Sequence, residues 1–592
     1  MKRIDVPVLI VGGGGSGLSV LTFLSSLGVD ALLIERHGST SILPKAHFFN
    51  QRSMEIFALH GMADAIYARS APRENMGKLI WMTSLGGEGR FDRRTIIEAD
   101  MMGCGEAQAP NDAKGFTHAT NISQYSLELV LRQQLEKRNA HMLFRHSLEV
   151  FTQDAKGVTA QVKNLDTEEV LEVRAQYMIA ADGGRTAGPM LGVQMLGPQG
   201  MGDFTSVVFK ADLSEYIDND RAVMRLFIHP ERPPNGRFAG CLLTMGPENW
   251  NRHSEEFCAI WMTRADDPGA TVTNENADSA VRDFFKIDVP IQVKFVSHWT
   301  LVAIVADRFK DGRVILIGDA AHRQTPGAGL GLNSGIQDAH NIAWKLAAIL
   351  KNGADPALLD TYEVERRPTI TRNVNWSLMS MSNTAVQMMA MGISPISPPV
   401  VNQMEFGRLF EDSPEGDTKR ALLKEIMRTQ RIEYNAHDMD MGFSYDAGAL
   451  VPDGSPPPWR DPLGSDYRPT ARPGRRLPHA WLDVDGQRRS THELIPSGGY
   501  LILTGVSGGP WCVAAEKAAA ELGLKMATYK IGSGGDAMEL TAQWWGQSEI
   551  DDDGVVLVRP DGHVGFRSRT MVKDPYSALI SALKKISFVD VK

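Results

Sequence analysis

Glycines near the start of the chain are spaced as in a loop that binds the pyrophosphate of a dinucleotide. The loop residues concerned are Gly12, Gly14, Ser16 and Gly17. They follow an apolar run at 6–11, and residues 18–27 favour a helix. A second apolar run at 31–35 ends in Glu35, so the segment has the order strand, glycine turn, helix, strand and acid that holds a dinucleotide. We expect the glycines to admit the pyrophosphate and Glu35 to accept hydrogen bonds from the ribose hydroxyls.

A second stretch that could bind an anion lies at 313–346. Residues 314–317 are apolar and mostly β-branched, which predicts a buried strand, and Asp319 follows it. A loop rich in proline and glycine comes next, and Asn333 or Ser334 could cap a following helix. The amino-terminal end of a helix behind such a loop favours negative charge. The sequence therefore predicts that this loop faces a negatively charged part of the ligand.

The bulk composition narrows the functional class. The 592 residues are too many for one core, and 43% hydrophobic content is that of a globular protein. A net charge of −9 argues against nucleic acid or an anionic membrane as partner. The four cysteines are scattered, without a Cys-x-x-Cys pair, which argues against a disulfide framework or zinc site; they are Cys104, Cys241, Cys258 and Cys512. No apolar run reaches the roughly 20 residues of a membrane span, so we expect a cytoplasmic protein.

Three separated signals together resemble one known family. They are the glycine loop with Glu35, Asp182-Gly183 after an apolar run at 177–181, and Gly318-Asp319 before Pro326. In this order they resemble the FAD-dependent aromatic hydroxylases, the group A flavoprotein monooxygenases with the p-hydroxybenzoate hydroxylase fold. Further short matches extend the resemblance to the phenol and chlorophenol hydroxylase branch, namely Ala46-His47, Asn50 to Glu55, Gly318 to His322, Ile336 to Asp338 and Asn341 to Lys345.

The resemblance implies an α/β fold in several parts. A Rossmann-type FAD-binding domain carries an inserted, mostly antiparallel sheet for the substrate, and a thioredoxin-like domain follows at the C-terminal end. The expected division is 1–195 with 304–385 for the FAD-binding domain (and part of 71–118 near the substrate), 196–303 for the substrate domain, 386–465 for a helical and linker region, and 466–592 for the thioredoxin-like domain. The last domain has only one thiol near its helix start, Cys512, so we do not expect disulfide exchange there.

Residue by residue, the resemblance assigns a cofactor site for tightly but non-covalently bound FAD. It comprises Gly12, Gly14, Ser16, Gly17, Glu35, Arg36, Arg52, Gln124, Asp182, Gly183, Asp319, Pro326, Gly331, Leu332 and Asn333. Asp319 would hold the ribityl chain, and Pro326 would lie beside the flavin ring. NAD(P)H and O₂ are the implied co-substrates, and oxygen transfer would pass through a flavin C4a-hydroperoxide. The helix that starts near Asn333 would stabilise the negative charge of the reduced flavin.

The substrate that this branch implies is a small phenol, hydroxylated ortho to its hydroxyl group. A phenol has a pKa near 10, so a base within hydrogen-bond reach would activate it. Related phenol hydroxylases have an aspartate five residues before the family's arginine, and here that position is His47. We expect His47 to act as the base and Pro326 to complete the catalytic site; the alternative for His47 is a hydrogen bond to cofactor or backbone.

Two other functions share parts of this pattern. The chain could be a tailoring oxygenase of a larger polycyclic or polyketide substrate, by hydroxylation or by Baeyer–Villiger chemistry. It could also be a flavin-binding or interaction protein whose C-terminal domain does the work, which Asp319, Pro326 and the complete glycine loop argue against. We expect a homodimer, with the C-terminal domain as a structural element.

Overall fold

The nucleotide-binding part of the protein is a largely parallel sheet covered by helices. The computed structural model describes residues 2–43, 45–100, 109–231, 239–263, 271–394 and 396–590, so Cys104 lies outside the described residues. The strand order is β18-β19-β10-β1-β2-β7, and β9 pairs with β10 and β8. The strands are β1 (Lys2–Val11), β2 (Ala31–Glu35), β7 (His141–Phe144), β8 (His146–Gln153), β9 (Val158–Asn164), β10 (Val170–Ala180), β18 (Lys310–Asp311) and β19 (Val314–Leu316).

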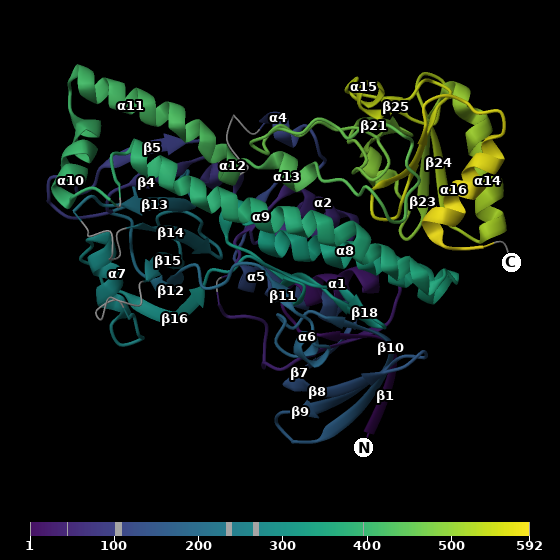
Figure 1. Cartoon of the computed structure of the whole chain (residues 1–592), viewed down its shortest axis with the longest axis horizontal. Helices are drawn as coiled ribbons and strands as arrows, with labels where there is room; N and C mark the ends of the chain where they lie inside the picture. Colours follow the sequence, from purple (N-terminus) through teal and green to yellow (C-terminus); the bar gives the residue numbers. More distant parts are fainter. Residues whose placement is uncertain are drawn as a thin grey trace.

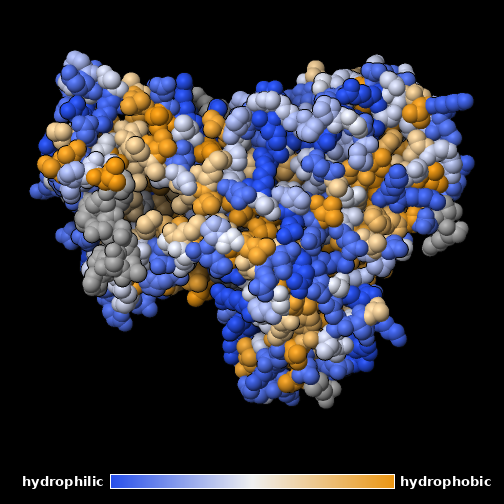
Figure 2. Space-filling model, in the orientation of Figure 1, coloured by the Kyte–Doolittle hydropathy of each residue, from blue (hydrophilic) through white to orange (hydrophobic). Residues whose placement is uncertain are grey.

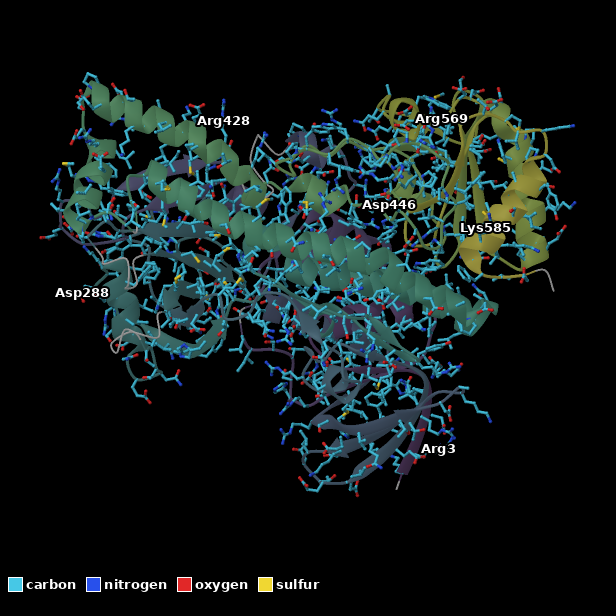
Figure 3. All side chains as sticks on the ribbon, in the orientation of Figure 1. Arg3, Asp288, Arg428, Asp446, Arg569 and Lys585 are labelled. Carbon is cyan, nitrogen blue, oxygen red and sulfur yellow. The ribbon has the colours of Figure 1, made fainter. Side chains whose placement is uncertain are left out.

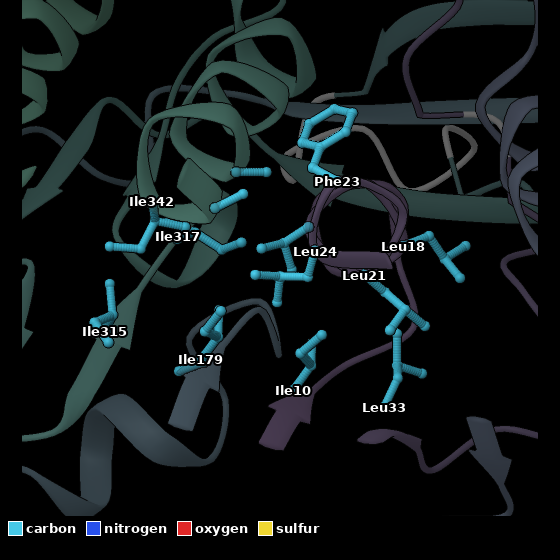
Figure 4. Close-up of a cluster of buried hydrophobic side chains, with 14 of the residues drawn as sticks. Ile10, Leu18, Leu21, Phe23, Leu24, Leu33, Ile179, Ile315, Ile317 and Ile342 are labelled. Carbon is cyan, nitrogen blue, oxygen red and sulfur yellow. The ribbon is translucent and has the colours of Figure 1, made fainter. Parts of the chain in front are cut away.

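The central strands are apolar without alternation because they are buried on both faces. Residues 8–11, 31–35 and 314–316 are buried throughout, as expected for parallel strands covered by helices. The packing of these strands on the neighbouring helices is visible in Figure 4, where Ile10, Ile179 and Ile315 face Leu21, Leu24 and Ile342. The helices of this part are α1 (Gly15–Ser26), α2 (Gln51–Leu59), α3 (Ala63–Tyr67), α5 (Gln124–Lys137), α6 (Ala187–Met190) and α8 (Leu330–Asn352).

A second, mostly antiparallel sheet is inserted between two parts of the first. Its strand order is β16-β12-β15-β14-β13-β4-β5, and only the β13–β4 pair is parallel. The strands are β4 (Leu79–Met82), β5 (Thr95–Ala99), β12 (Asp203–Lys210), β13 (Met224–Ile228), β14 (Ala239–Gly246), β15 (Glu256–Thr263) and β16 (Gln292–Thr300), with α7 (Ala277–Phe285) packed on one face. Small strand pairs join the two parts: β3 (Phe48–Phe49) with β6 (Thr120–Asn121), and β11 (Met195–Leu196) with β17 (Ile304–Ala306) and β20 (His322–Arg323).

Long helices run across the molecule between these sheets and the C-terminal domain. In Figure 1, α8 and α9 cross the centre, and the C-terminal domain lies at the end away from the inserted sheet. The helices after α8 are α9 (Asp360–Ala390), α10 (Pro399–Gly407), α11 (Pro414–Ile426), α12 (Arg431–Tyr434) and α13 (His437–Met441); a short α4 (Ala109–Asp112) lies earlier in the chain. No helix among the described residues is long and apolar enough to span a bilayer.

The C-terminal domain is a four-stranded sheet flanked by helices. The order is β24-β23-β26-β27, in which β23 and β24 are parallel and the other pairs antiparallel. Its main elements are β23 (Tyr500–Gly505), α14 (Gly509–Leu522), β24 (Met526–Ile531), α15 (Trp544–Ser548), β26 (Val555–Val558), β27 (Val564–Ser568) and α16 (Pro575–Ser587), with a small sheet of β21 (Trp481–Val484), β22 (Gln487–Ser490) and β25 (Met538–Glu539). The predicted fold class, including the inserted sheet and the thioredoxin-like domain, is confirmed.

The proline-rich segment before this domain is packed, although its composition is typical of a linker. Residues 447–478 have the composition of a flexible linker, yet Tyr467, Arg475 and Arg476 are fully buried in them. The reason is charge pairing, since Arg476 donates to both oxygens of Glu55 on α2. The segment is therefore an irregular but packed connection.

The face of the molecule shown in Figure 2 is mainly hydrophilic. Figure 2 shows hydrophilic residues spread over this face, with hydrophobic residues in smaller groups between them. The labelled charged side chains Arg3, Asp288, Arg428 and Lys585 lie at the rim in Figure 3. The charged side chains that support the candidate site, Asp338 and Arg366, are instead buried.

Candidate active site

The glycine loop after β1 is shaped by two close backbone approaches. A Cβ at Gly17 would overlap the carbonyl oxygen of Gly12, and one at Gly12 would overlap the carbonyl oxygen of Ala181. Gly12 also has φ +109°, which disfavours any side chain. Gly14 differs, because its nearest neighbour would be Glu128 Oε1 at 3.8 Å, so the space above it is open. The loop thus leaves room for a ligand at Gly14 while Gly12 and Gly17 hold its shape.

The amino-terminal ends of α1 and α8 meet at this loop. Leu332 of α8 packs against Gly15 of α1, where a Cβ would lie 2.8 Å from Leu332 Cδ1. Ser16 points between Gly318 and Gly335. Neither helix has a capping side chain or an acidic residue in its first turn. Without a side-chain cap, the backbone N–H groups at these two helix ends favour an anionic ligand, which fits the pyrophosphate and the flavin of FAD.

Glu35 is tied to the glycine loop, as its position at the end of β2 predicts. Its two carboxylate oxygens accept hydrogen bonds from the backbone nitrogens of Gly13, at 2.7 Å, and His37, at 2.8 Å. The side chain of Glu35 is buried, whereas Arg36 is exposed. This arrangement holds the carboxylate at the loop with lone pairs left for a ribose.

The two aspartate signals lie side by side. A Cβ at Gly184 would be 3.2 Å from the carbonyl oxygen of Asp319, so the loop after β10 touches the turn at 318–320. Asp182 accepts hydrogen bonds from three backbone nitrogens that follow it, those of Gly184, Thr186 and Ala187. Gly183 has φ +71°, and Asp319 is exposed. Asp182 shapes its own loop, and Asp319 has a carboxylate free to meet a ligand.

A buried charge cluster supports the turn from below. Asp338 of α8 accepts hydrogen bonds from Arg366 Nε and from the backbone nitrogen of Gly318, and it pairs with His322 Nε2 at 2.8 Å. Burial alone would raise the pKa of Asp338, but Arg366 and His322 hold it below its ordinary value. His322 therefore helps to hold the shape of the loop.

The loop from Arg323 to Gly329 presents unpaired polar groups. Pro326 is exposed, and Ala328 has φ +59°, a left-handed conformation that is strained for alanine. Buried side-chain atoms of three successive residues have no hydrogen-bond partner among the described residues; they are Nε of Arg323, both amide atoms of Gln324 and Oγ1 of Thr325. Unpaired buried polar atoms are costly, so this loop fits a bound polar ring such as that of FAD.

Asn333 lies inside its helix rather than at the cap that its sequence predicts. Helix α8 begins at Leu330, and Gly329 precedes it with φ +62°. The side chain of Asn333 is buried and reaches back, donating to the carbonyl oxygens of Gly329 at 2.6 Å and Phe48 at 3.0 Å. Capping by Asn333 or Ser334 is therefore wrong, because the glycine turn continues directly into the helix. Gly331 and Leu332 are half-buried at its first turn.

Gln124 lies where the long helix α5 approaches the loop. Its amide oxygen accepts from the backbone nitrogen of Ala46, and its amide nitrogen donates to Glu128 at 2.7 Å. Glu128 is buried, and its other oxygen accepts from the nitrogen of Ser41. Burial raises the pKa of Glu128. Gln124 thus connects the segment that carries His47 to the region of Gly14.

Arg52, a predicted cofactor residue, makes its hydrogen bond to the C-terminal domain. Its side chain is 1% exposed, donates to the carbonyl oxygen of Asp561 at 2.9 Å and lies 3.4 Å from Glu55. The match to the family's arginine predicts a cofactor contact, but the guanidinium points to the C-terminal domain instead. The sequence could not show this, because Asp561 is 509 residues away.

His47 is half-buried beside Asn121. The Asn121 side-chain amide nitrogen lies 2.9 Å from His47 Nδ1, which makes Nδ1 the acceptor and leaves the proton of the neutral ring on Nε2. Burial lowers the pKa of His47 to about 4, against a weaker opposing effect of the Asn121 hydrogen bond. Such a ring donates a hydrogen bond more readily than it accepts a proton.

Two residues on α12, Glu433 and Tyr434, lie near the loop 323–329 but have no signal in the sequence. The short turn η4 (Gly327–Gly329), which follows Pro326, packs against α12. Glu433 and Tyr434 on α12 line a pocket together with Ala328 and Phe48. Tyr434 also meets Trp81 of β4 edge to face, with ring centroids 5.8 Å apart. No local sequence pattern marks this segment.

The geometry agrees with comparisons to known proteins. A family model for the FAD binding domain matches residues 5–377, and one for the C-terminal part of aromatic-ring hydroxylases matches 470–587. The 2,4-dichlorophenol 6-monooxygenase of Delftia acidovorans is 32% identical over 591 residues, covering 98% of each chain. The tetracenomycin B2 monooxygenase-dioxygenase of Streptomyces olivaceus is 31% identical over 598 residues, covering 99% of each.

A solved structure of similar shape extends the agreement to the whole fold. The flavin-dependent monooxygenase PieE, in complex with FAD and substrate, superposes with a TM-score of 0.90 at 33% identity, covering 99% of this chain and 100% of PieE. The two family models, the related sequences and the solved structure therefore agree with the loop geometry in indicating an FAD-binding enzyme. The chain belongs to the FAD-dependent aromatic-ring hydroxylases, and it is a flavoprotein monooxygenase that uses FAD, NAD(P)H and O₂.

Proposed function

We propose that this enzyme hydroxylates a small phenolic compound ortho to its hydroxyl group. The observation that carries this proposal is the aromatic and apolar wall between the loop 323–329, which we call the flavin loop, and the inserted sheet. Phe48, Trp81 and Tyr434 belong to one cluster there, together with Met224 and Leu226 of β13. Flat apolar walls with few polar groups suit a single aromatic ring. A relative of similar length is named for its action on 2,4-dichlorophenol, which supports the same substrate class.

The cofactor site is proposed to consist of the residues that meet at the two helix ends. Bound FAD would supply electron transfer and oxygen activation, and the chain would bind and orient it. Gly12, Gly14 and Gly17 would admit the pyrophosphate, and Asp319 would hold the ribityl chain. The first turn of α8, with Gly331 and Leu332, would face the edge of the ring that becomes negative on reduction, because its backbone N–H groups are free.

NAD(P)H is proposed to bind transiently at the same face rather than in a second nucleotide fold. The support is that the loop of Asp182 and Gly183 touches the turn of Asp319 through Gly184, so one set of loops can serve both nucleotides. Stopped-flow reduction of the Asp182→Ala holoenzyme would test this. We expect slower reduction by NAD(P)H with the FAD content retained; unchanged reduction would contradict a role in NAD(P)H binding.

His47 is proposed to contact the substrate hydroxyl. Its Nε2 carries the proton when Nδ1 accepts from Asn121, so it would donate a hydrogen bond to a phenolate oxygen. The His47→Phe variant should raise the KM for phenols while a His47→Gln variant, which keeps a donor, recovers part of the affinity. Unchanged turnover of phenols at neutral pH in His47→Phe would remove this residue from the site.

A tailoring reaction on a larger polycyclic substrate is the second candidate. The match to the tetracenomycin B2 monooxygenase-dioxygenase over 99% of both chains favours it. A substrate panel separates the two: NAD(P)H oxidation and hydrogen peroxide release with phenol, chlorophenols, hydroxybenzoates and bulkier phenols. A true substrate raises oxidation without an equal rise in peroxide, so coupling with only the bulky compounds would select the second function.

The active form is proposed to be a homodimer. Light scattering of the full chain after size exclusion measures this directly, and a monomeric mass would contradict it.

A further inference from the structure

The pocket beneath the flavin loop contains acidic groups that the functions above do not use. Its walls come from three places: Phe48 of β3, Ala328 of η4, and Glu433, Tyr434 and Asp440 of α12 and α13. Ala328 belongs to the same loop as Pro326, which is proposed to lie beside the flavin ring. Tyr434 at the same time touches Trp81 of the inserted sheet. The pair Glu433–Tyr434 therefore stands where the flavin loop and the substrate sheet meet.

Glu433 has an unused proton-binding atom in this pocket. Its Oε2 is buried and has no hydrogen-bond partner among the described residues. Burial raises the pKa of Glu433 to about 8, against a weaker opposing hydrogen bond with Tyr434. A phenol has a pKa near 10, so a carboxylate of this basicity matches a phenolic proton far better than His47, whose pKa is about 4.

We propose that Glu433 takes the proton from the hydroxyl group of the phenolic substrate and that Tyr434 holds this hydroxyl beside the flavin loop. The inference rests on the phenolic substrate proposed above. In this step the O–H bond of the substrate breaks, its electron pair stays on the phenolate oxygen, and a new O–H bond forms at a carboxylate oxygen of Glu433. Nothing is oxidised or reduced, and the phenolate ring becomes the stronger nucleophile that hydroxylation needs.

The same pocket could carry the proton from Glu433 to the protein surface. Asp112 also lines it, and its side chain is 27% exposed, so the pocket reaches the surface near α4. Asp440 and His437 line the same pocket. Burial raises the pKa of Asp440 to about 7 and lowers that of His437 to about 3, so the carboxyl can exchange protons at neutral pH and the imidazole stays neutral. The titratable groups facing Glu433 across the pocket are thus Tyr434, His437, Asp440 and Asp112.

The test compares Glu433→Gln and Tyr434→Phe with the wild-type holoenzyme, using Glu425→Gln as a matched control on the exposed face of α11. Glutamine keeps the size of a protonated glutamate, and the ratio of flavin to protein absorbance checks folding. The ionisation of bound 4-nitrophenol, read from its visible phenolate band, and the pH profile of phenol hydroxylation are the readouts. Glu433→Gln should bind 4-nitrophenol as the neutral phenol and lower kcat about 100-fold, with the inflection near pH 8 lost.

The remaining outcomes separate this inference from the proposed function. Tyr434→Phe should raise KM and keep the pH inflection, and Glu433→Asp should restore part of kcat because a carboxyl is present again. If Glu433→Gln ionises 4-nitrophenol and hydroxylates phenol as the wild type does, the assignment of Glu433 is overturned while the phenolic function stands. If the wild-type enzyme hydroxylates no phenol, the proposed function fails first, and this inference falls with it.

Discussion

Asn333 at the start of helix α8 and Asn50 at the start of helix α2 are joined by a hydrogen bond although 283 residues separate them. The Asn333 amide oxygen accepts from the backbone nitrogen of Asn50 at 3.1 Å, and Asn50 in turn donates through its side chain to Asp440 at 2.8 Å. Asn50 also caps α2 by accepting from the nitrogen of Ser53. One side chain therefore fixes the first turn of α8, the strand that carries Phe48, and the pocket beneath the flavin loop.

Asn333→Ala should weaken FAD binding without unfolding the protein. The change removes three hydrogen bonds, to Gly329, Phe48 and Asn50. At about 1 kcal/mol each, some of which the loosened loop recovers, we expect a loss of FAD affinity of at least about tenfold. Fluorescence titration of the apoprotein with FAD measures this. Asn352→Ala, at the exposed far end of the same helix, is the control and should bind FAD as the wild type does.

Gly14→Ala and Gly17→Ala should show separately which glycine is needed for FAD binding and which is needed for folding. Gly14 has φ −79°, which alanine adopts freely, and a Cβ there would lie 3.8 Å from its nearest neighbour. A Cβ at Gly17 would overlap the carbonyl oxygen of Gly12. We therefore expect Gly14→Ala apoprotein to melt like the wild type but to bind FAD poorly, because the methyl group occupies the space of the pyrophosphate. Gly17→Ala should lower the melting temperature of the apoprotein itself. Equal FAD affinity in Gly14→Ala and wild type would remove Gly14 from the site.

The parts of this protein that sequence predicts are those whose signal is local. The glycine loop, the strands of the inserted sheet and the C-terminal alternation depend on periodicity within a few residues, and each appears in the structure. Apart from the start of α8, the departures involve partners far apart in sequence. Arg52 donates to the carbonyl oxygen of Asp561, and the residues around Arg476 are buried against Glu55, because contacts between distant segments override composition. Glu433 carries no local mark, since its environment is made by Phe48 and Ala328 from other parts of the chain.

Glu365→Gln should destabilise the docking of the C-terminal domain. Glu365 of α9 is fully buried and accepts from Lys345 at 2.9 Å, from Arg559 at 2.7 and 3.0 Å, and from Asn341 at 2.7 Å. Burial would raise the pKa of Glu365, but Arg559 and Lys345 lower it to about 2, so the carboxylate is charged. Removing that charge leaves two buried cations short of a partner, which costs about 3–5 kcal/mol.

The matched control for Glu365 lies on the same helix. Asp360 pairs with Lys310 at the surface, with its side chain 65% exposed, so Asp360→Asn should change stability by no more than about 1 kcal/mol. Chemical denaturation followed by tryptophan fluorescence measures both variants, and Trp344, beside Arg559, reports on the docked interface. Equal effects of the two substitutions would contradict the importance of the buried cluster.

The protein should lose stability as the pH falls from about 6.5 towards 5. Several buried histidines have pKa values lowered by burial: His60 and His437 to about 3, His563 to about 4, and His340 and His492 well below the ordinary value. The unfolded chain takes up protons at these histidines near pH 6.5 and the folded chain does not, so stability falls with falling pH.

Each histidine contributes at most about 2 kcal/mol to this loss of stability at pH 5, because one pKa unit corresponds to about 1.36 kcal/mol. The raised pKa values of Glu433, Asp440 and Glu128 act in the opposite sense, but these groups are fewer than the histidines. Melting temperatures between pH 5 and 8 measure how steeply stability depends on pH. The His340→Leu variant should show a weaker dependence, because the buried His340 ring packs edge-on against Phe23 and is neutral in the folded protein. A melting temperature that stays constant down to pH 5 would mean that these histidines accept protons in the folded state.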